Sequence, residues 1–280
     1  MSYGQYRDDR SSSLKMRLII AAVIALISFI TYLSTGSKNE ITGEKQRVAM
    51  TSQEEIALGL NAEPQMMQQS GGLARDASAR ALVDRVGGEL LGALDRKLAS
   101  QGRRNPYPFK FHLLSDPQTV NAFALPGGQV FITVGLFKDL ETEGQLAGVL
   151  GHEVGHVLAR HGAQQLAKQQ LTQGLVGAAG VAGGSADSAR MAQAIGEMVN
   201  MKYGRGDEVQ ADEWGVKLMA DAGYDPRAML GVMKILDRVS QGDSQPEFLS
   251  THPKPANRER YIEEVIKREF PNGVPPGLKP

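Results

Sequence analysis

Two histidines and a glutamate stand at a spacing that suits metal-assisted hydrolysis. They belong to the run His-Glu-Val-Gly-His at residues 152–156. Because residues four apart share one face of a helix, the imidazole nitrogens of His152 and His156 can bind a single Zn²⁺. Glu153 can then reach a water molecule on that ion and act as a general base. The competing interpretation is a chance match on a purely structural helix.

A third protein ligand is needed, because a catalytic zinc takes three and keeps one position open. The chain has no cysteine, so this ligand must be a carboxylate or one of the remaining histidines, His112, His161 and His252. His161 is expected to point elsewhere, because it lies about half a turn from the pair's face on the same predicted helix. Glu208 and Asp212, four apart, can supply a ligand and a hydrogen-bond acceptor for a ligand imidazole. The competing interpretation is that these two acids only mark the exposed start of a helix, where the helix dipole favours negative charge.

Apolar periodicity predicts the helix that carries the histidine pair, over about residues 142–168, with Thr142 in a Thr-x-x-Gln cap. An earlier helix is predicted to begin at Ser52, in a Ser-x-x-Glu capping box, and another to run over about 79–98. These helices form the expected scaffold around the site.

The second half of the chain is also predicted to be helical, with helices that begin near Asp207, Asp225 and Asn257. Between the histidine pair and these helices lies the segment 164–200, which is rich in alanine and glycine at 175–184. That run is too short to span a bilayer, so a helical hairpin or a lid over the cleft is predicted there.

Three strand-like runs, at 109–114, 122–125 and 129–134, predict a small antiparallel sheet. The segment 121–128 begins Asn121, Ala122, Phe123 and Ala124 and continues with a proline and two glycines. Proline is tolerated on an edge strand, and such an edge beside a cleft can pair with an extended peptide. A simple hairpin turn at residues 126–128 explains the same residues.

The N-terminal part of the chain contains an uncharged apolar run at residues 18–33. We interpret it as a transmembrane anchor. The alternatives are a buried core helix, which the polar flanks disfavour, and a cleaved signal peptide, which the lack of a small-residue cleavage site after the run disfavours. The basic residues before it favour a cytoplasmic tail over 1–17. The expected organisation then continues with a linker at 34–50, a catalytic domain at 51–270 outside the cytoplasmic membrane, and a flexible tail at 271–280.

Composition excludes several classes of function. Hydrophobic residues make up 41% of the chain and charged residues 22%, as in ordinary globular proteins. Lysine plus arginine and aspartate plus glutamate both total 31, so charge offers no sign of nucleic-acid binding. The lack of cysteine excludes disulfides, thiolate metal sites and a lipid-modified N-terminal cysteine.

Several motifs in order resemble one known family. They are the 152–156 run, Glu208-x-x-Ala211-Asp212, Thr251-His252-Pro253 with Arg258 after it, and the 121–128 segment. Together they are similar to the zinc metallopeptidases that include HtpX, the CAAX prenyl endopeptidases and periplasmic outer-membrane quality-control proteases. The resemblance implies an α+β, predominantly helical, zincin-like (gluzincin) domain with a small antiparallel sheet, which follows one N-terminal transmembrane helix.

The resemblance also implies roles for individual residues. One Zn²⁺ per chain would be held by His152, His156 and Glu208, with Glu153 as the general base. Asp212 would orient a ligand histidine without binding the metal itself. His252 would face the metal, either steadying the oxyanion or acting as an extra ligand, and Arg258 would stand near the same cleft as a further catalytic residue. Asn121, Ala122, Phe123 and Ala124 would bind substrate in extended form.

The expected protein is therefore a single-pass enzyme of the cytoplasmic (inner) membrane, with its catalytic domain on the periplasmic side. Its expected substrates are misfolded or exported polypeptides, and its expected partners are the bilayer, through residues 18–33, and envelope assembly or quality-control proteins. The multi-span architecture and the lipoprotein cysteine of some family members are absent, which argues against prenyl-protein processing. The alternative is a chaperone or scaffold with a latent zinc site.

Overall fold

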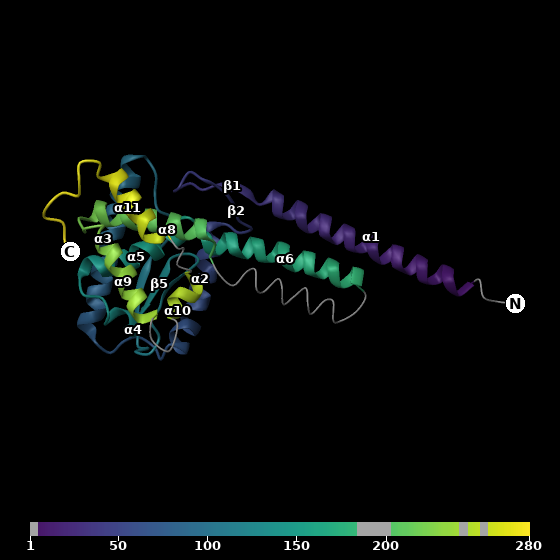
Figure 1. Cartoon of the computed structure of the whole chain (residues 1–280), viewed down its shortest axis with the longest axis horizontal. Coiled ribbons are helices and arrows are strands. Elements are labelled where there is room, and N and C mark those ends of the chain that lie inside the picture. The colour runs from purple at the N-terminus through teal and green to yellow at the C-terminus, as the bar shows by residue number, and fades with distance from the viewer. Residues whose placement is uncertain (1–4, 184–202, 241–245, 253–256) are drawn as a thin grey trace. The chain divides into compact units, whose positions relative to one another are not determined.

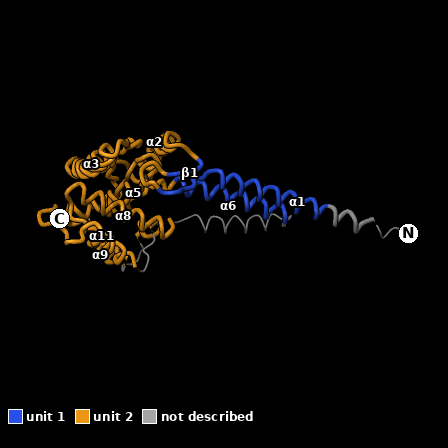
Figure 2. The backbone as a smooth tube through the Cα atoms, turned by 90° about the horizontal axis from the view of Figure 1, so that it is seen from above, with its two compact units in different colours: residues 1–38, 44–49, 163–201 blue, residues 39–43, 50–162, 202–280 orange. Residues whose placement is uncertain are grey.

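The computed structural model describes residues 5–183, 203–240, 246–252 and 257–280. The chain divides into two compact units, which Figure 2 distinguishes by colour. Unit 1 comprises residues 1–38, 44–49 and 163–201, and unit 2 comprises residues 39–43, 50–162 and 202–280. All of the site residues expected from the sequence lie in unit 2.

Unit 1 contains the apolar N-terminal helix α1 (Gln5–Ser34), and the part of it from Ser13 to Ser34 is long and apolar enough to cross a membrane. Strands β1 (Gly36–Lys38) and β2 (Lys45–Arg47) form an antiparallel ribbon within the stretch expected to be a linker. Arg17 of α1 donates hydrogen bonds to the carbonyl oxygens of Val181 and Ala182, so α1 is in contact with α6 (His161–Gly183).

Unit 2 confirms the prediction of a predominantly helical α+β domain (Figure 1). Its helices are α2 (Ser52–Gln69), α3 (Ala77–Ser100), α4 (Val134–Phe137), α5 (Glu143–Leu158), α8 (Arg205–Ala222), α9 (Ala228–Ser240), α10 (Glu247–Thr251) and α11 (Arg258–Glu269). The cap of α2 is Thr51, one residue before the predicted one, whereas Thr142 caps α5 as predicted, by accepting from Gln145 N.

The sheet has three strands, β3 (Lys110–Leu114), β4 (Ala122–Leu125) and β5 (Gln129–Thr133), in the order β3-β5-β4. The β4 and β5 strands pair antiparallel as predicted, but β3 and β5 are parallel, so the sheet is mixed. The reason is that the chain crosses from β3 to the far edge before β4 turns back, and β5 then fills the gap. Consequently β4 is an edge strand.

The central helix α5 is buried along nearly its whole length and packs against α8. Small residues allow this close approach. A Cβ atom added to Gly151 would lie 3.2 Å from the Cα atom of Gly215, and one added to Gly155 would lie 2.8 Å from the carbonyl oxygen of Ala211. The two backbones therefore come near enough for side chains on both helices to meet.

The predicted continuous helix over residues 142–168 is wrong, because α5 ends at Leu158 and α6 (His161–Gly183) begins after a turn. Arg160 adopts φ +59°, the left-handed conformation that ends a helix. Its guanidinium holds this turn by donating to Glu55 Oε2 at 2.9 Å and to the Met50 carbonyl oxygen at 2.6 Å. The chain therefore changes direction just before His161. The rest of the predicted lid, residues 184–200, lies outside the described residues.

The C-terminal segment 271–280, expected to be flexible, is tied to unit 2 by backbone hydrogen bonds. Asp225 N donates to Lys279 O at 2.7 Å, and Gly144 N donates to Pro280 O at 2.7 Å. Lys279 also reaches Glu89 of α3 at 2.7 Å through its ammonium group. These contacts connect the tail to the start of α5 and to the loop between α8 and α9.

Candidate metal centre

The histidine pair on α5 faces a carboxylate on α8. His152 Nε2 and His156 Nε2 lie 3.0 Å apart, and the Glu208 carboxylate oxygens lie 3.6 and 3.4 Å from these two nitrogens. None of the three side chains is more than 2% exposed. Two imidazole nitrogens and a carboxylate oxygen, from the three residues that the sequence predicted as ligands, thus converge in the buried interior.

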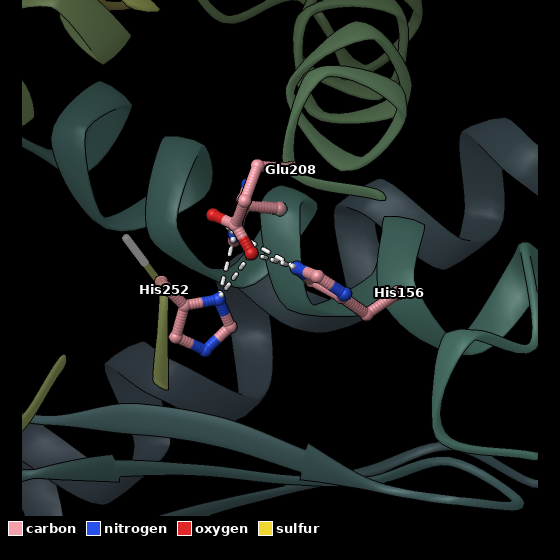
Figure 3. A group of neighbouring side chains, drawn as sticks. His156, Glu208 and His252 are labelled. Atoms are coloured by element: carbon pink, nitrogen blue, oxygen red, sulfur yellow. Dashed lines mark hydrogen bonds and ion pairs between the residues drawn. The ribbon is translucent and has the colours of Figure 1, made fainter. Parts of the chain in front are cut away.

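A fourth donor comes from a distant part of the chain. His252, which follows α10, places its Nδ1 atom 3.1 Å from Glu208 Oε1 (Figure 3). The same atom lies 3.3 Å from His152 Nε2. Ligand atoms of His152, His156, Glu208 and His252 all lie within 4.8 Å of one another. We call these four residues the donor group.

The donor group fits a metal ion by its chemistry. Its nitrogen and carboxylate donors are the kinds that divalent transition metals and zinc prefer. Glu153 lies beside it, 1% exposed, and within the described residues its Oε1 atom has no hydrogen-bond partner. Buried carboxylate oxygens are rarely left unpaired. A water molecule on a bound cation would satisfy this atom.

The surroundings of Glu153 affect its protonation. Burial raises the pKa of its carboxyl group, and the neighbouring histidines His252 and His152 oppose that shift. His252 Nε2 lies 3.6 Å from Glu153 Oε1, so the two groups share one wall of the site. A carboxyl group with a raised pKa is suited to both accepting and returning a proton.

Asp212 and Arg258 form a buried layer behind His152. Asp212 Oδ1 lies 2.8 Å from His152 Nδ1. Arg258 donates from Nε and Nη2 to the two oxygens of Asp212, each at 2.8 Å, and is itself 1% exposed. Burial would raise the pKa of Asp212, but Arg258 and His152 outweigh it and hold that pKa below its ordinary value. Arg258 therefore supports Asp212 from the protein interior.

His161 lies against the donor group, contrary to the expectation that it points elsewhere. Its Nδ1 atom is 2.9 Å from His156 Nδ1, and the residue is 2% exposed. The turn at Arg160 brings it there. His112 was also a possible third ligand from the sequence. It lies on β3, where its Nε2 atom is 2.9 Å from Gln129 Oε1, and it is outside the donor group.

Sequence reasoning missed two aromatic residues that pack on the donor group. The ring of Tyr203 lies 4.2 Å from that of His156, and the ring of Phe248 stacks on His252 at 4.6 Å. Neither residue belongs to a recognisable motif. Phe248 could have been found from its spacing, because it stands four residues before His252 and such residues share one side of a helix.

The segment expected to bind substrate forms the edge strand β4. Asn121 pairs inward with β5: Thr133 N donates to Asn121 O at 3.0 Å. In an antiparallel pair, successive residues alternate between facing the partner strand and facing away from it, so the backbone groups of Ala122 and Ala124 are directed away from β5. Ala122 is fully buried there, whereas Ala124 is partly exposed. The turn that follows is held under α2, where a Cβ atom on Gly127 would collide with the Ile56 backbone at 2.4 Å.

Comparison with known proteins agrees with this geometry. The model of Peptidase family M48 matches residues 80–266 of the chain. A beta-barrel assembly-enhancing protease of Yersinia pestis is 34% identical over 197 residues, which cover 65% of this chain and 39% of that protein. The mitochondrial metalloendopeptidase OMA1 of Schizosaccharomyces pombe is 35% identical over 169 residues, which cover 58% of this chain and 49% of that protein. The chain thus spans less than half the length of either relative.

Proposed function

Since the chain belongs to peptidase family M48, we propose that it is a zinc-dependent endopeptidase whose metal is held by His152, His156 and Glu208. The observation that carries this proposal is the meeting of two imidazole nitrogens and a carboxylate from α5 and α8 beside Glu153, whose Oε1 atom accepts no hydrogen bond from the described part of the chain. Three such ligands with a neighbouring glutamate are typical of hydrolytic zinc sites.

A zinc ion bound by these residues would lower the pKa of a coordinated water and polarise the scissile carbonyl. The chain's own groups then move the proton. Glu153 takes it from the attacking water and delivers it to the leaving amine. His252, with Nε2 3.6 Å from Glu153, is placed to donate to the oxygen that gains negative charge.

Asp212 and Arg258 act on the site indirectly in this proposal. Asp212 accepts the Nδ1 hydrogen of His152, which leaves the Nε2 lone pair free for the metal. Arg258 holds both oxygens of Asp212 and balances its charge. Arg258 Nη1 also lies 3.2 Å from Glu208 Oε2, so the guanidinium contacts a metal ligand as well as Asp212. We therefore assign the buried Arg258 a positioning role rather than the catalytic role expected from the sequence.

An extended polypeptide would bind along β4. The outward backbone groups of Ala124, which is partly exposed, can form hydrogen bonds with a peptide in strand conformation, and displacement of what covers Ala122 would extend the pairing. Such bonds do not depend on the side chains of the substrate, which suits an enzyme that acts on many misfolded or exported proteins. The name of the Yersinia pestis relative, which refers to beta-barrel assembly, supports substrates or partners in the cell envelope.

We further propose that α1 anchors the protein in the cytoplasmic membrane, with residues 1–17 in the cytoplasm and the catalytic unit on the other side. The apolar segment Ser13–Ser34 and the basic residues before it support this orientation. In spheroplasts, added protease should degrade the catalytic unit without lysis. Protection until lysis would contradict the orientation.

The variant Glu153→Gln tests the proposed chemistry. In the purified full-length protein it should abolish cleavage of casein while zinc content stays at the wild-type level, because the ligands are intact. Chelation of the wild type should stop cleavage, and added zinc should restore it. Cleavage of casein by Glu153→Gln at the wild-type rate would refute the role of Glu153.

A latent state is the second candidate, and one observation favours it: His252 Nδ1 lies among the ligand atoms, 3.1 Å from Glu208 Oε1. If His252 fills the fourth position, the wild type would be a poor protease with tightly held zinc. His252→Ala should then cleave casein faster than the wild type. If His252 instead assists the reaction, the same variant should be slower.

A further inference from the structure

The two histidines of the α5 pair have different partners. His152 is held by the carboxylate of Asp212 at 2.8 Å, whereas His156 is held by another imidazole, that of His161, at 2.9 Å. Metal-binding histidines usually donate their second N–H to an acceptor that fixes the ring. The structure therefore raises the question of which nitrogen in the His156–His161 contact carries the hydrogen.

The partners of His161 answer that question. Its Nε2 atom lies 2.7 Å from Gln210 Oε1 and 3.8 Å from Asp207 Oδ1, so two oxygens on α8 face this nitrogen. A hydrogen on Nε2 satisfies them, and in a neutral imidazole the other nitrogen, Nδ1, is then an acceptor. His161 Nδ1 consequently accepts from His156 Nδ1.

The same tautomer is the one that a metal ligand requires. His156 directs Nε2 into the donor group, 3.4 Å from Glu208 Oε1. With its hydrogen on Nδ1, the lone pair of Nε2 is free to bind a cation. The opposite tautomer of His161 would place a hydrogen on His156 Nε2 and block that ligand.

We propose that His161 is a positioning residue that fixes the tautomer and ring orientation of His156 and thereby slows release of the bound metal. This inference rests on the proposed function, in which His156 is a metal ligand. It adds a chain of hydrogen bonds from Gln210 through His161 to His156. That chain exists because Arg160 turns the backbone between α5 and α6, stabilised by Glu55.

The test compares two substitutions of similar shape in the zinc-loaded full-length protein. His161→Asn keeps an acceptor where Nδ1 stood, and His161→Leu removes it. Zinc release to a chromogenic chelator should be about 10- to 100-fold faster for His161→Leu than for the wild type, and within a few-fold of wild type for His161→Asn. Gln210→Leu, which frees the tautomer of His161, should give an intermediate release rate.

The matched control is His112→Leu. His112 is also a buried histidine bonded to a glutamine, with Nε2 2.9 Å from Gln129 Oε1, but it lies outside the donor group. Both leucine variants should lower the melting temperature in chelator, since both lose a buried hydrogen bond. Only His161→Leu should speed zinc release and alter the visible spectrum of the cobalt-substituted protein.

Two outcomes would overturn the inference. Zinc release from His161→Leu within threefold of the wild-type rate would show that His161 does not support the ligand. Release from His161→Asn as fast as from His161→Leu would show that the acceptor atom is irrelevant. A wild-type protein that binds no zinc would instead refute the proposed function, so the two failures are distinguishable.

Discussion

Gly155 and Ala211 bring the two ligand-bearing helices together, since a Cβ atom on Gly155 would lie 2.8 Å from the carbonyl oxygen of Ala211. The atom in the way belongs to the backbone and cannot move without shifting α8. The distance between His156 and Glu208 therefore depends on the absence of a side chain at position 155.

We expect Gly155→Ala to separate α5 from α8. Overpacking of this kind typically costs about 1–3 kcal/mol of stability. Because the displaced helix carries Glu208, zinc affinity measured by chelator competition should fall at least tenfold, roughly the effect of losing support to a ligand.

Gly148→Ala is the control, on the same helix. There the added Cβ atom would meet Met229 at 3.5 Å, an ordinary contact. This variant should bind zinc like the wild type. Equal zinc affinity in both alanine variants would mean that the close approach at Gly155 does not position the ligands.

Arg160→Gly tests the turn that ends α5. Glycine tolerates the φ of +59°, so the variant keeps the turn but removes the guanidinium that pairs with Glu55, which is 2% exposed, and that donates to the Met50 carbonyl oxygen. Glu55 keeps the hydrogen bond from the Tyr107 hydroxyl, but leaving a buried carboxylate without its cationic partner costs about 3–5 kcal/mol. Urea unfolding with chelator present, followed by the fluorescence of Trp214, should show a loss of that size at neutral pH.

The ion pair of Arg227 and Asp225 provides the comparison, because the Arg227 side chain is 60% exposed and the Asp225 side chain is 18% exposed. Arg227→Ala should change the free energy of unfolding by about 1 kcal/mol or less. A loss in Arg160→Gly no larger than in Arg227→Ala would contradict a structural role for the Glu55–Arg160 pair.

The loss of unfolding free energy in Arg160→Gly, relative to the wild type, should depend on pH. Burial raises the pKa of Glu55 above 4.5, and Arg160 partly opposes that shift. Without Arg160 the pKa of Glu55 rises further, so the cost of burying the charged form is present at high pH and disappears as the carboxyl group is protonated. The difference from wild type should narrow as pH falls from neutral towards 4.5, and a constant difference would refute this cause.

The contribution of Glu89 to stability should also depend on pH, but here the charged carboxylate stabilises the fold. Hydrogen bonds from Lys279 and Tyr224 lower the pKa of Glu89 from 4.5 to about 2. Its charged form therefore stabilises the fold above pH 4.5, and this contribution is lost as pH falls towards 2. Unfolding in chelator should show Glu89→Gln less stable than wild type at neutral pH and equal to it near pH 2. A stability difference that persists at pH 2 would mean that the charged carboxylate of Glu89 does not stabilise the C-terminal segment.

The sequence was most informative where a motif constrains chemistry. The spacing of His152 and His156 placed both on one helix face, and Glu208 with Asp212 on another, and the structure brings these faces together. The sequence was least informative where a single backbone angle determines the direction of the chain. The apolar periodicity predicted a helix that continues through Arg160. The left-handed conformation of Arg160 instead ends that helix and turns His161 back onto His156.

Long-range contacts were also hidden from the sequence. The parallel pairing of β3 with β5 depends on how the chain crosses the sheet, which local patterns do not record. The C-terminal segment looked like a flexible tail from its proline and glycine content. Its order comes from partners such as Gly144 and Glu89, more than a hundred residues away along the chain.

The central claim, that Glu208 completes a zinc site with the α5 histidines, is tested most directly by the zinc affinity of Glu208→Ala in the full-length protein. Its control is Glu213→Ala, a nearby acid on α8 that pairs with Lys217 instead. We predict about one tightly held zinc per chain in the wild type and in Glu213→Ala, and loss of that zinc to a chelator in Glu208→Ala. Stoichiometric zinc held by Glu208→Ala as tightly as by the wild type would contradict the account.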